Sequence, residues 1–165
     1  MIELLDKKHN RKDFDCGKEL LNNYLKNQAG QDIKRKLSAC FVLAENDTDF
    51  IQGYYTLSNN SIPLSCFPEP IKRKLPQSYE SIPTTLLGRL AIDRNFKGKG
   101  LGKILLIDAL RRSYEISKEI GSYAVVVDPI DREAELFYAK YGFIKLPDSG
   151  KMFIAIRTLK ELFDK

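Results

Sequence analysis

The sequence has 165 residues, of which 43% are hydrophobic and 30% charged, and a formal net charge of +5. This length suits one domain with its own core, so we predict a single domain over residues 1–165. The sequence has no run of about 18 apolar residues and no apolar signal segment near its start, so we expect a cytoplasmic protein without a membrane span. The three cysteines form no CxxC pair, and we expect no metal site.

The positive charge gathers in four short clusters, at residues 7–12, 34–36, 72–74 and 97–103. Such clusters form solvated loops with a few phosphate contacts, or a basic face for a polyanion such as RNA. The pattern leaves both interpretations open. His9 lies inside the first cluster, which favours a solvated surface histidine over a catalytic one.

The apolar patterns predict secondary structure over most of the chain. A strand is expected at 2–5, a helix at 17–29, and strands at 37–44 and 51–58 joined by a polar turn. Residues 59–83 contain five prolines and no sustained period, so they predict a long loop, of a kind that is often functional or carries short helices. The remaining predictions are a strand at 84–93, a helix at 100–120, a strand at 123–127, a helix at 131–140, strands at 143–146 and 152–156, and a helix at 159–163. This order predicts a mixed α/β fold with parallel pairing across 84–127.

The segment Asn95–Gly102 reads NFKGKGLG and lies between a predicted strand and a predicted helix. Glycine lets the backbone approach a ligand closely, and a helix start offers unpaired N–H groups, so the segment predicts a phosphate-binding turn. It is not a Walker A loop, because GxxxxGK[ST] is absent. A dinucleotide-binding turn stays open as an alternative, although the glycine spacing differs and the unit is not repeated.

Two segments resemble the GNAT superfamily of N-acetyltransferases: LGRLAIDRNFKGKGLGKILLIDAL and YAVVVDPIDREAELFYAKYGF. The first carries the glycines of the R/Q-x-x-G-x-G/A motif as Gly98 and Gly100, with Asn95 in place of Arg or Gln. The second matches a family element through Ala134, Phe137, Tyr138, Gly142 and Phe143. The resemblance implies a mostly antiparallel sheet of six to seven strands, flanked by helices and splayed between its central parallel strands.

The resemblance also covers FDCGKELLNNYLKNQAGQDIKRKLSACFVL, GYYTLSNNSI and IPTTLLGRLAID, and there it is closest to the GNAT-type toxins of bacterial toxin–antitoxin modules. It implies transfer of acetyl from acetyl-CoA to the α-amine of aminoacyl-tRNA, which blocks translation. It also implies a ribbon-helix-helix antitoxin as partner. A homodimer is a further expectation, because exposed strands near the C-terminus would allow one.

The resemblance assigns the cofactor-binding residues. The strand backbone would pair with the pantetheine arm, and the turn amides would hold the pyrophosphate. The residues concerned are Leu90, Ala91 and Ile92 in the strand, and Lys97, Gly98, Lys99, Gly100, Leu101, Gly102 and Lys103 in the turn. The three lysines would add positive charge, or they are simply solvated.

Tyr138 is the expected general acid for the leaving thiolate, with Tyr141 as its nearest competitor; spacing alone favours a core aromatic, and the family match favours catalysis. A general base is not required, because an α-amine has a pKa of about 7.7–8.0. Asp93 acting through a water stays open, but we interpret it as structural.

Arg89 interrupts an apolar strand, so it either pairs with an acid on an exposed face or contacts the substrate. The other expected substrate contacts are Lys34, Arg35, Lys36 and Arg73. Two other functions stay open: a GNAT enzyme acting on a small amine or a protein N-terminus, and a binding module without catalysis.

Overall fold

The computed structural model describes residues 1–164 and divides them into two compact units. Unit 1 comprises residues 1–58 and 87–109, and unit 2 comprises residues 59–86 and 110–164. Three elements pass from one unit into the other along the chain: β3 (Ile51–Pro63), β4 (Ser81–Ile92) and α4 (Leu101–Ser117). The single domain over residues 1–165 stays a prediction, and residue 165 lies outside the described part.

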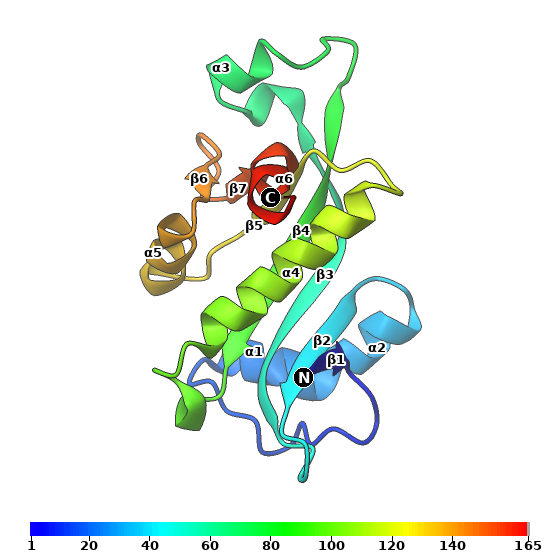
Figure 1. Cartoon of the computed structure of the whole chain (residues 1–165), viewed down its shortest axis with the longest axis vertical. Coiled ribbons are helices and arrows are strands. Elements are labelled where there is room, and N and C mark those ends of the chain that lie inside the picture. The colour runs from blue at the N-terminus through cyan, green and yellow to red at the C-terminus, as the bar shows by residue number, and fades with distance from the viewer. Residues whose placement is uncertain (165) are drawn as a thin grey trace. The chain divides into compact units, whose positions relative to one another are not determined.

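A seven-stranded sheet runs through residues 1–164 in the order β1-β2-β3-β4-β5-β7-β6 (Figure 1). Its other strands are β1 (Ile2–Leu4), β2 (Ala39–Ala44), β5 (Ala124–Val127), β6 (Ile144–Lys145) and β7 (Met152–Ala155). β4 and β5 are parallel, with Thr85 opposite Val125 and Leu86 opposite Val126. Neighbours β1–β2, β2–β3, β5–β7 and β6–β7 are antiparallel. The predicted fold class, with its parallel pair across a β–α–β unit, is confirmed.

Two adjacent tyrosines of β3, Tyr54 and Tyr55, form hydrogen bonds to the helices on the two faces of the sheet in unit 1. Successive side chains of a strand point to opposite faces of the sheet. The Tyr54 hydroxyl donates to the Leu21 carbonyl of α1 (Glu19–Asn23) at 2.7 Å, whereas the Tyr55 hydroxyl donates to Asp108 of α4 at 2.6 Å. Both tyrosines are fully buried. Helices α1 and α4 therefore cover opposite faces of β3 (Figure 1).

The helix predicted at 17–29 begins later and extends further than expected. Gly17 has a φ of +88°, outside the helical range, and α1 begins at Glu19. A π-helical segment, η1 (Tyr24–Gln28), joins α1 to α2 (Ala29–Lys34). A π segment adds a residue to the turn and shifts the apolar stripe, so a 3.6-residue period does not find the end of the helix.

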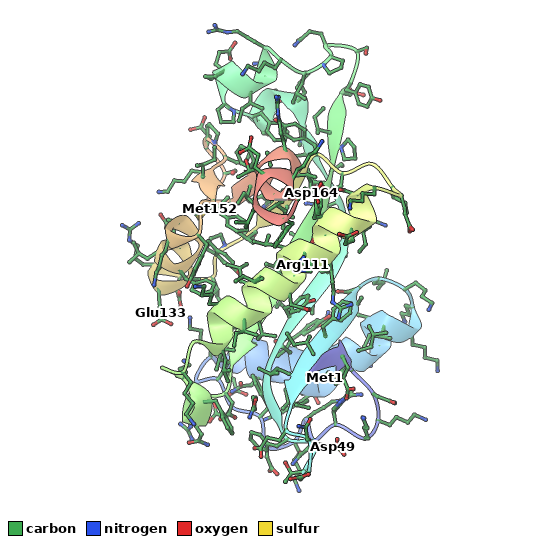
Figure 2. The ribbon with its side chains drawn as sticks, in the orientation of Figure 1. Met1, Asp49, Arg111, Glu133, Met152 and Asp164 are labelled. Carbon is green, nitrogen blue, oxygen red and sulfur yellow. The ribbon has the colours of Figure 1, made fainter. Side chains whose placement is uncertain are left out.

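Unit 2 packs α6 (Ile156–Phe163) against the second half of α4. The Tyr114 hydroxyl donates to the Asp164 carboxylate, and the Arg111 guanidinium carbon lies 4.5 Å from the centre of the Phe163 ring. Figure 2 labels Arg111 on α4 and Asp164 after α6. The Phe67 ring contacts Phe153 edge-on, with ring centres 5.5 Å apart. This contact ties the proline-rich segment to the core of unit 2.

The prediction of a loop over 59–83 is wrong at both ends, where the structure has strand residues. β3 continues to Pro63 and β4 already begins at Ser81, with two short helices at 64–66 and 69–72 between them. The first part is polar and the second contains Pro83, so neither has the composition of a typical strand.

His9 is buried, so the expectation of a solvated histidine is wrong. Its Nδ1 accepts a hydrogen bond from the Asp6 backbone N–H at 2.9 Å, and its Nε2 lies 2.7 Å from Glu3 Oε1. These partners fix the N-terminal strand, which is a structural role.

Among the helices described over 1–164, none combines the length and apolarity needed to cross a bilayer.

Substituting Gly53 tests the close packing beneath the end of β4. A Cβ there would lie 2.7 Å from Ile92 Cδ1, 2.8 Å from Leu105 Cδ1 and 2.9 Å from the Ala91 carbonyl oxygen. We expect Gly53→Ala to lower the free energy of unfolding by about 1–3 kcal/mol, because the backbone at Ala91 must shift to make room for the added methyl group. Urea unfolding measures this loss. Gly121→Ala is the control, since a Cβ at Gly121 meets nothing within 4 Å, and an equal loss in both variants would contradict the packing argument.

Candidate functional site

The turn after β4 is an open backbone loop at the start of a long helix. A 3-10 helix, η3 (Arg94–Phe96), follows Asp93, and α4 begins at Leu101. Gly98 and Gly100 have φ values of +80° and +77°, and a Cβ at either would meet nothing within 4 Å. Glycine is needed here for its conformation, and the space beside the turn is free. Gly102, predicted to serve in the same way, is instead the second residue of α4.

The first turn of α4 presents backbone donors to this open space. Its first hydrogen bond runs from the Ile104 N–H to the Gly100 carbonyl at 3.3 Å. Within the described chain, the N–H groups of Leu101, Gly102 and Lys103 therefore have no backbone acceptor. Unpaired N–H groups and the positive end of a helix dipole favour an anion such as a phosphate group.

The three lysines of this turn lie on its surface. Lys97, Lys99 and Lys103 are all exposed, and the Lys99 ammonium lies 5.1 Å from the centre of the Phe96 ring. Exposed ammonium groups attract an anion but are strongly screened by solvent. The backbone therefore supplies the fixed part of the site, and the lysines add positive charge.

Asp93 anchors the start of the turn. Its side chain is 1% exposed, and its carboxylate accepts from the Asn95 backbone N–H at 2.9 Å and from the Asp15 backbone N–H at 3.0 Å. The Asp93 N–H donates to the Gln52 carbonyl of β3 at 2.8 Å. Asp93 thus joins the turn to β3 and to the N-terminal segment, which is a structural role.

Asp15 completes this anchor. Its carbonyl accepts from the Arg94 N–H, and its carboxylate lies 3.1 Å from the Arg94 guanidinium. The Asp15 carboxylate also accepts from the Gly17 N–H and the Asn22 side-chain amide, both at 2.9 Å. The hydrogen bond from Gly17, aided by the one from Asn22, lowers the pKa of the Asp15 carboxyl. Sequence reasoning missed Asp15, because nothing local marks its contact with Asp93, 78 positions later, and with it Asn22, which binds Asp15.

The strand segment Leu90–Ile92 forms the end of β4 in unit 1. Ala91 is buried and its two neighbours are half-buried. Gly53 of β3 lies directly against Ala91, where any larger side chain would collide. The backbone of this segment is therefore held firmly from the β3 side.

Arg89 does not pair with an acid on an exposed face, as one interpretation of the sequence had it. It is half-buried, and its guanidinium carbon lies 3.5 Å from the centre of the Tyr24 ring. Sequence reasoning missed this contact with Tyr24.

The other predicted substrate contacts are exposed cations. Lys34 ends α2, Arg35 follows it, and Lys36 has a φ of +62°. All three belong to unit 1. Arg73 belongs to unit 2, where it follows α3 (Glu69–Lys72) and is also exposed. These side chains are accessible to a large anionic ligand.

Tyr138 lies in unit 2 on α5 (Arg132–Lys140), a helix that begins at a proper cap. The Asp131 carboxylate accepts from the Ala134 N–H at 2.9 Å, as an N-cap does. The Tyr138 ring is 6% exposed and packs on Phe143 and Phe137, with ring centres 5.2 and 5.4 Å away. Burial raises the pKa of Tyr138, so the phenol stays protonated at neutral pH.

The Tyr138 hydroxyl makes no hydrogen bond to another group in residues 1–164. The fully buried side-chain atoms without a partner there are Thr56 Oγ1 and Thr84 Oγ1, so the unpaired Tyr138 oxygen reaches the surface. Tyr141, its competitor, ends the same helix and packs its ring on Phe137 at 5.2 Å. A buried ring with an open, protonated hydroxyl is suited to donate a proton.

No group of three or more His, Cys, Asp or Glu side chains in the described chain could hold a metal ion. Cys16 and Cys40 are buried, and Cys66 is partly buried. Burial raises the pKa of both Cys16 and Cys40, which makes them poor nucleophiles.

Comparisons with known proteins identify the family. Residues 78–157 match the model of the acetyltransferase (GNAT) domain. The chain is 32% identical to a probable toxin TacT of Sinorhizobium fredii, over 98% of this chain and 94% of that protein. It is 33% identical to a tRNA-acetylating toxin of Mycobacterium tuberculosis, over 79% of this chain and 75% of that protein.

The chain belongs to the GNAT family of acetyltransferases. By family it is an N-acetyltransferase, and its relatives TacT, KacT and AtaT are GNAT toxins of toxin–antitoxin modules.

Solved structures of GNAT toxins match almost the whole chain. A tyrosine-to-phenylalanine mutant of KacT has a TM-score of 0.93 and 31% identity, over 99% of this chain and 98% of that one. AtaT complexed with acetyl-methionyl-tRNAfMet has a TM-score of 0.91 and 30% identity, with the same coverage. A tyrosine mutant of AtaT bound to acetyl-CoA and the C-terminus of the antitoxin AtaR has a TM-score of 0.84 and 28% identity, over 100% and 98%.

Replacing Asp93 by Asn tests the anchor of the turn in this GNAT protein. An amide offers one acceptor oxygen and places its NH₂ group against a backbone N–H, so one of the two hydrogen bonds is lost. We expect the free energy of unfolding to fall by about 1–3 kcal/mol, measured by urea titration. Asp128→Asn is the control, because Asp128 is exposed and forms a 3.6 Å surface ion pair with Lys151. Equal stability of Asp93→Asn and the wild type would refute the anchor.

Proposed function

We propose that this protein transfers acetyl from acetyl-CoA to the α-amine of aminoacyl-tRNA and thereby blocks translation. The observation that carries the acetyl-CoA part is the open turn at Gly98 and Gly100, followed by unpaired N–H groups at the start of α4. The acceptor part rests on the relatives, one described as a tRNA-acetylating toxin and another solved with acetyl-methionyl-tRNAfMet.

The turn and the strand before it would hold the cofactor. The amides of residues 97–103 would bind the pyrophosphate, with charge added by Lys97, Lys99 and Lys103. The backbone of Leu90–Ile92 would pair with the pantetheine arm and turn an N–H toward the thioester carbonyl oxygen. Bound acetyl-CoA supplies the activated acetyl group. The tight packing of Gly53 on Ala91 supports this proposal, because it fixes the donor backbone in advance.

Tyr138 would donate the proton that the leaving thiolate needs. Its ring is locked by Phe137 and Phe143, and its hydroxyl is protonated and makes no hydrogen bond within residues 1–164. A fixed phenol loses no rotational freedom when it donates. The relatives solved as tyrosine-to-phenylalanine mutants support a special role for one tyrosine in those proteins.

No protein base is needed for this acceptor. An α-amine has a pKa of about 7.7–8.0, so a substantial share is neutral at pH 7, whereas a lysine amine at about 10.4 would need a base. His9 is buried against Glu3, and Asp93 is occupied by two backbone N–H groups. Because both of these groups are occupied, an acceptor that needs no base, such as an α-amine, is favoured over a lysine side chain.

Basic side chains would hold the tRNA. Arg89, Lys34, Arg35, Lys36 and Arg73 are the proposed contacts, and the last four are exposed as such a role requires. Phosphate contacts of this kind give affinity that falls steeply with salt. If the protein instead acetylated a small amine or a protein N-terminus, these cations would be ordinary solvated surface.

An antitoxin is the proposed partner, since one relative is solved with the C-terminus of AtaR. Its ribbon-helix-helix type, a homodimer of this chain and a cytoplasmic location stay predictions.

Removing the Tyr138 hydroxyl tests the proposed general acid. We expect Tyr138→Phe to lower kcat for charged tRNA by about 10²–10⁴-fold, the range for a lost general acid, with little change in acetyl-CoA affinity. Time courses of labelled acetyl transfer and calorimetric titration measure the two quantities. Tyr141→Phe, on the same helix, should retain nearly full kcat. Full turnover by Tyr138→Phe would end this assignment.

A pair of glycine variants tests the phosphate-binding turn. Gly100 and Gly150 have similar positive φ values, +77° and +71°, and free space around an added Cβ. Alanine should therefore strain both sites by about 1–2 kcal/mol. Only Gly100→Ala should weaken acetyl-CoA binding, by about tenfold or more, because it alters the cradle. Titration calorimetry on both variants decides, and unchanged affinity in Gly100→Ala would contradict the proposed pyrophosphate site.

A further inference from the structure

The Tyr24 ring forms the surface on which the Arg89 guanidinium rests. The guanidinium carbon lies 3.5 Å from the ring centre, which is direct contact. Both residues belong to unit 1, Tyr24 at the start of η1 and Arg89 in β4. A guanidinium stacks on an aromatic ring with its flat face. The N–H groups at its edge therefore stay available to a ligand.

Tyr24 is itself held in place. It is 4% exposed, its hydroxyl donates to the Asp32 carboxylate at 2.8 Å, and its ring is nearly parallel to Tyr54, with centres 6.4 Å apart. Burial, together with the hydrogen bond to Asp32, raises the pKa of Tyr24 to about 12. The ring is therefore a fixed, neutral support.

The Arg89 guanidinium stacks on a ring and forms no ion pair over residues 1–164. The Asp32 carboxylate accepts from the Tyr24 hydroxyl instead. A half-buried guanidinium that is stacked but not ion-paired keeps unused N–H donors, so the site favours an anionic ligand. The planar N–H edge of arginine matches the two oxygens of a phosphate group.

A second arginine lies near the same helical layer. Arg11 Nη1 would be 3.0 Å from a Cβ placed at Gly30 of α2. Burial raises the pKa of the Cys40 thiol to about 12, and the positive charges of Arg11 and Arg89 both oppose this rise. Two guanidinium groups therefore lie close enough to one buried thiol of unit 1 to influence its pKa.

Resting on the function proposed above, we propose that Tyr24 is a positioning residue. Held by Asp32, it orients Arg89 so that the guanidinium binds a phosphodiester of the tRNA substrate. Arg89 directly precedes Leu90–Ile92, the segment proposed to bind pantetheine, which would bring that phosphodiester to the strand carrying the acetyl donor. The phosphates of acetyl-CoA share this chemistry, and the experiment separates the two sources.

The test compares Tyr24→Leu, Tyr24→Phe and Arg89→Gln on two acceptors. One is charged tRNA, and the other is an amino-acid methyl ester, which has the α-amine but no phosphate. We expect Tyr24→Leu and Arg89→Gln to raise KM for charged tRNA by about tenfold or more, because a charge-assisted hydrogen bond is lost or misplaced. Their kcat, methyl-ester rates and acetyl-CoA affinity should stay within about twofold. Tyr24→Phe keeps the ring and should lie between wild type and Tyr24→Leu.

A double variant shows whether the two residues act through one contact. Tyr24→Leu combined with Arg89→Gln should bind tRNA no more weakly than Arg89→Gln alone, since removing the guanidinium leaves nothing for the ring to orient. Additive losses would overturn the positioning role.

Matched controls come from unit 2. The Tyr114 hydroxyl donates to Asp164, and the Lys118 ammonium lies 4.7 Å from the Tyr114 ring centre. Tyr114→Phe therefore removes the same kind of hydrogen bond elsewhere, and Arg157→Gln removes an exposed arginine. Both should leave KM for tRNA unchanged.

Three results would overturn the inference: an equal loss on the methyl ester, a loss of acetyl-CoA affinity, or unchanged tRNA binding by Arg89→Gln in a filter assay. If Tyr24→Leu fails to fold, Tyr24→Phe, which loses only the hydrogen bond to Asp32, tests the positioning role in the same filter assay, and unchanged tRNA binding by this variant would overturn that role. Wild-type protein that acetylates the ester but no charged tRNA would refute the proposed function separately.

Discussion

The hydrogen bonds of the buried Asp93 carboxylate are the interaction on which the candidate site depends. Asp93 directly follows β4, and its two oxygens accept from Asn95 in the turn and from Asp15 in the N-terminal segment. The chain can then follow positive φ values at Gly98 and Gly100 and start α4 with free donors. Without this anchor, the turn would have to be ordered when ligand binds, at a cost in affinity.

The same unit also supports the proposed acceptor side. Tyr54 and Tyr55 alternate across β3 and hold α1 and α4 on opposite faces. On the α1 face, Tyr54 stacks with Tyr24, on which Arg89 rests. On the other face, Leu105 of α4 lies against Gly53, which itself contacts the Ala91 carbonyl. The backbone proposed to bind cofactor and the side chain proposed to bind substrate therefore belong to one strand, β4.

The sequence predicted the sheet, its parallel pair and the glycine turn, because these depend on local periodicity and on glycine chemistry. It did not predict two contacts between distant residues, Asp15 with Asp93 and Tyr24 with Arg89, or the local contact of His9 with Glu3. His9 looked solvated because its neighbours are charged, yet its ring is buried and contacts Glu3 of β1. A sequence motif predicted the residues that we propose to bind cofactor. The groups that hold those residues in place, such as Asp15 and Gly53, lie in segments without a motif.

Acetyl transfer to charged tRNA is the central claim, and one assay tests it most directly. Labelled acetyl-CoA is offered with charged tRNA, the same tRNA after deacylation, and a mixture of free amines. We expect label on charged tRNA alone, removed together with the amino acid by mild base that cleaves the ester. Label on free amines, with none on charged tRNA, would contradict it and would leave Lys34–Lys36 and Arg73 as solvated surface.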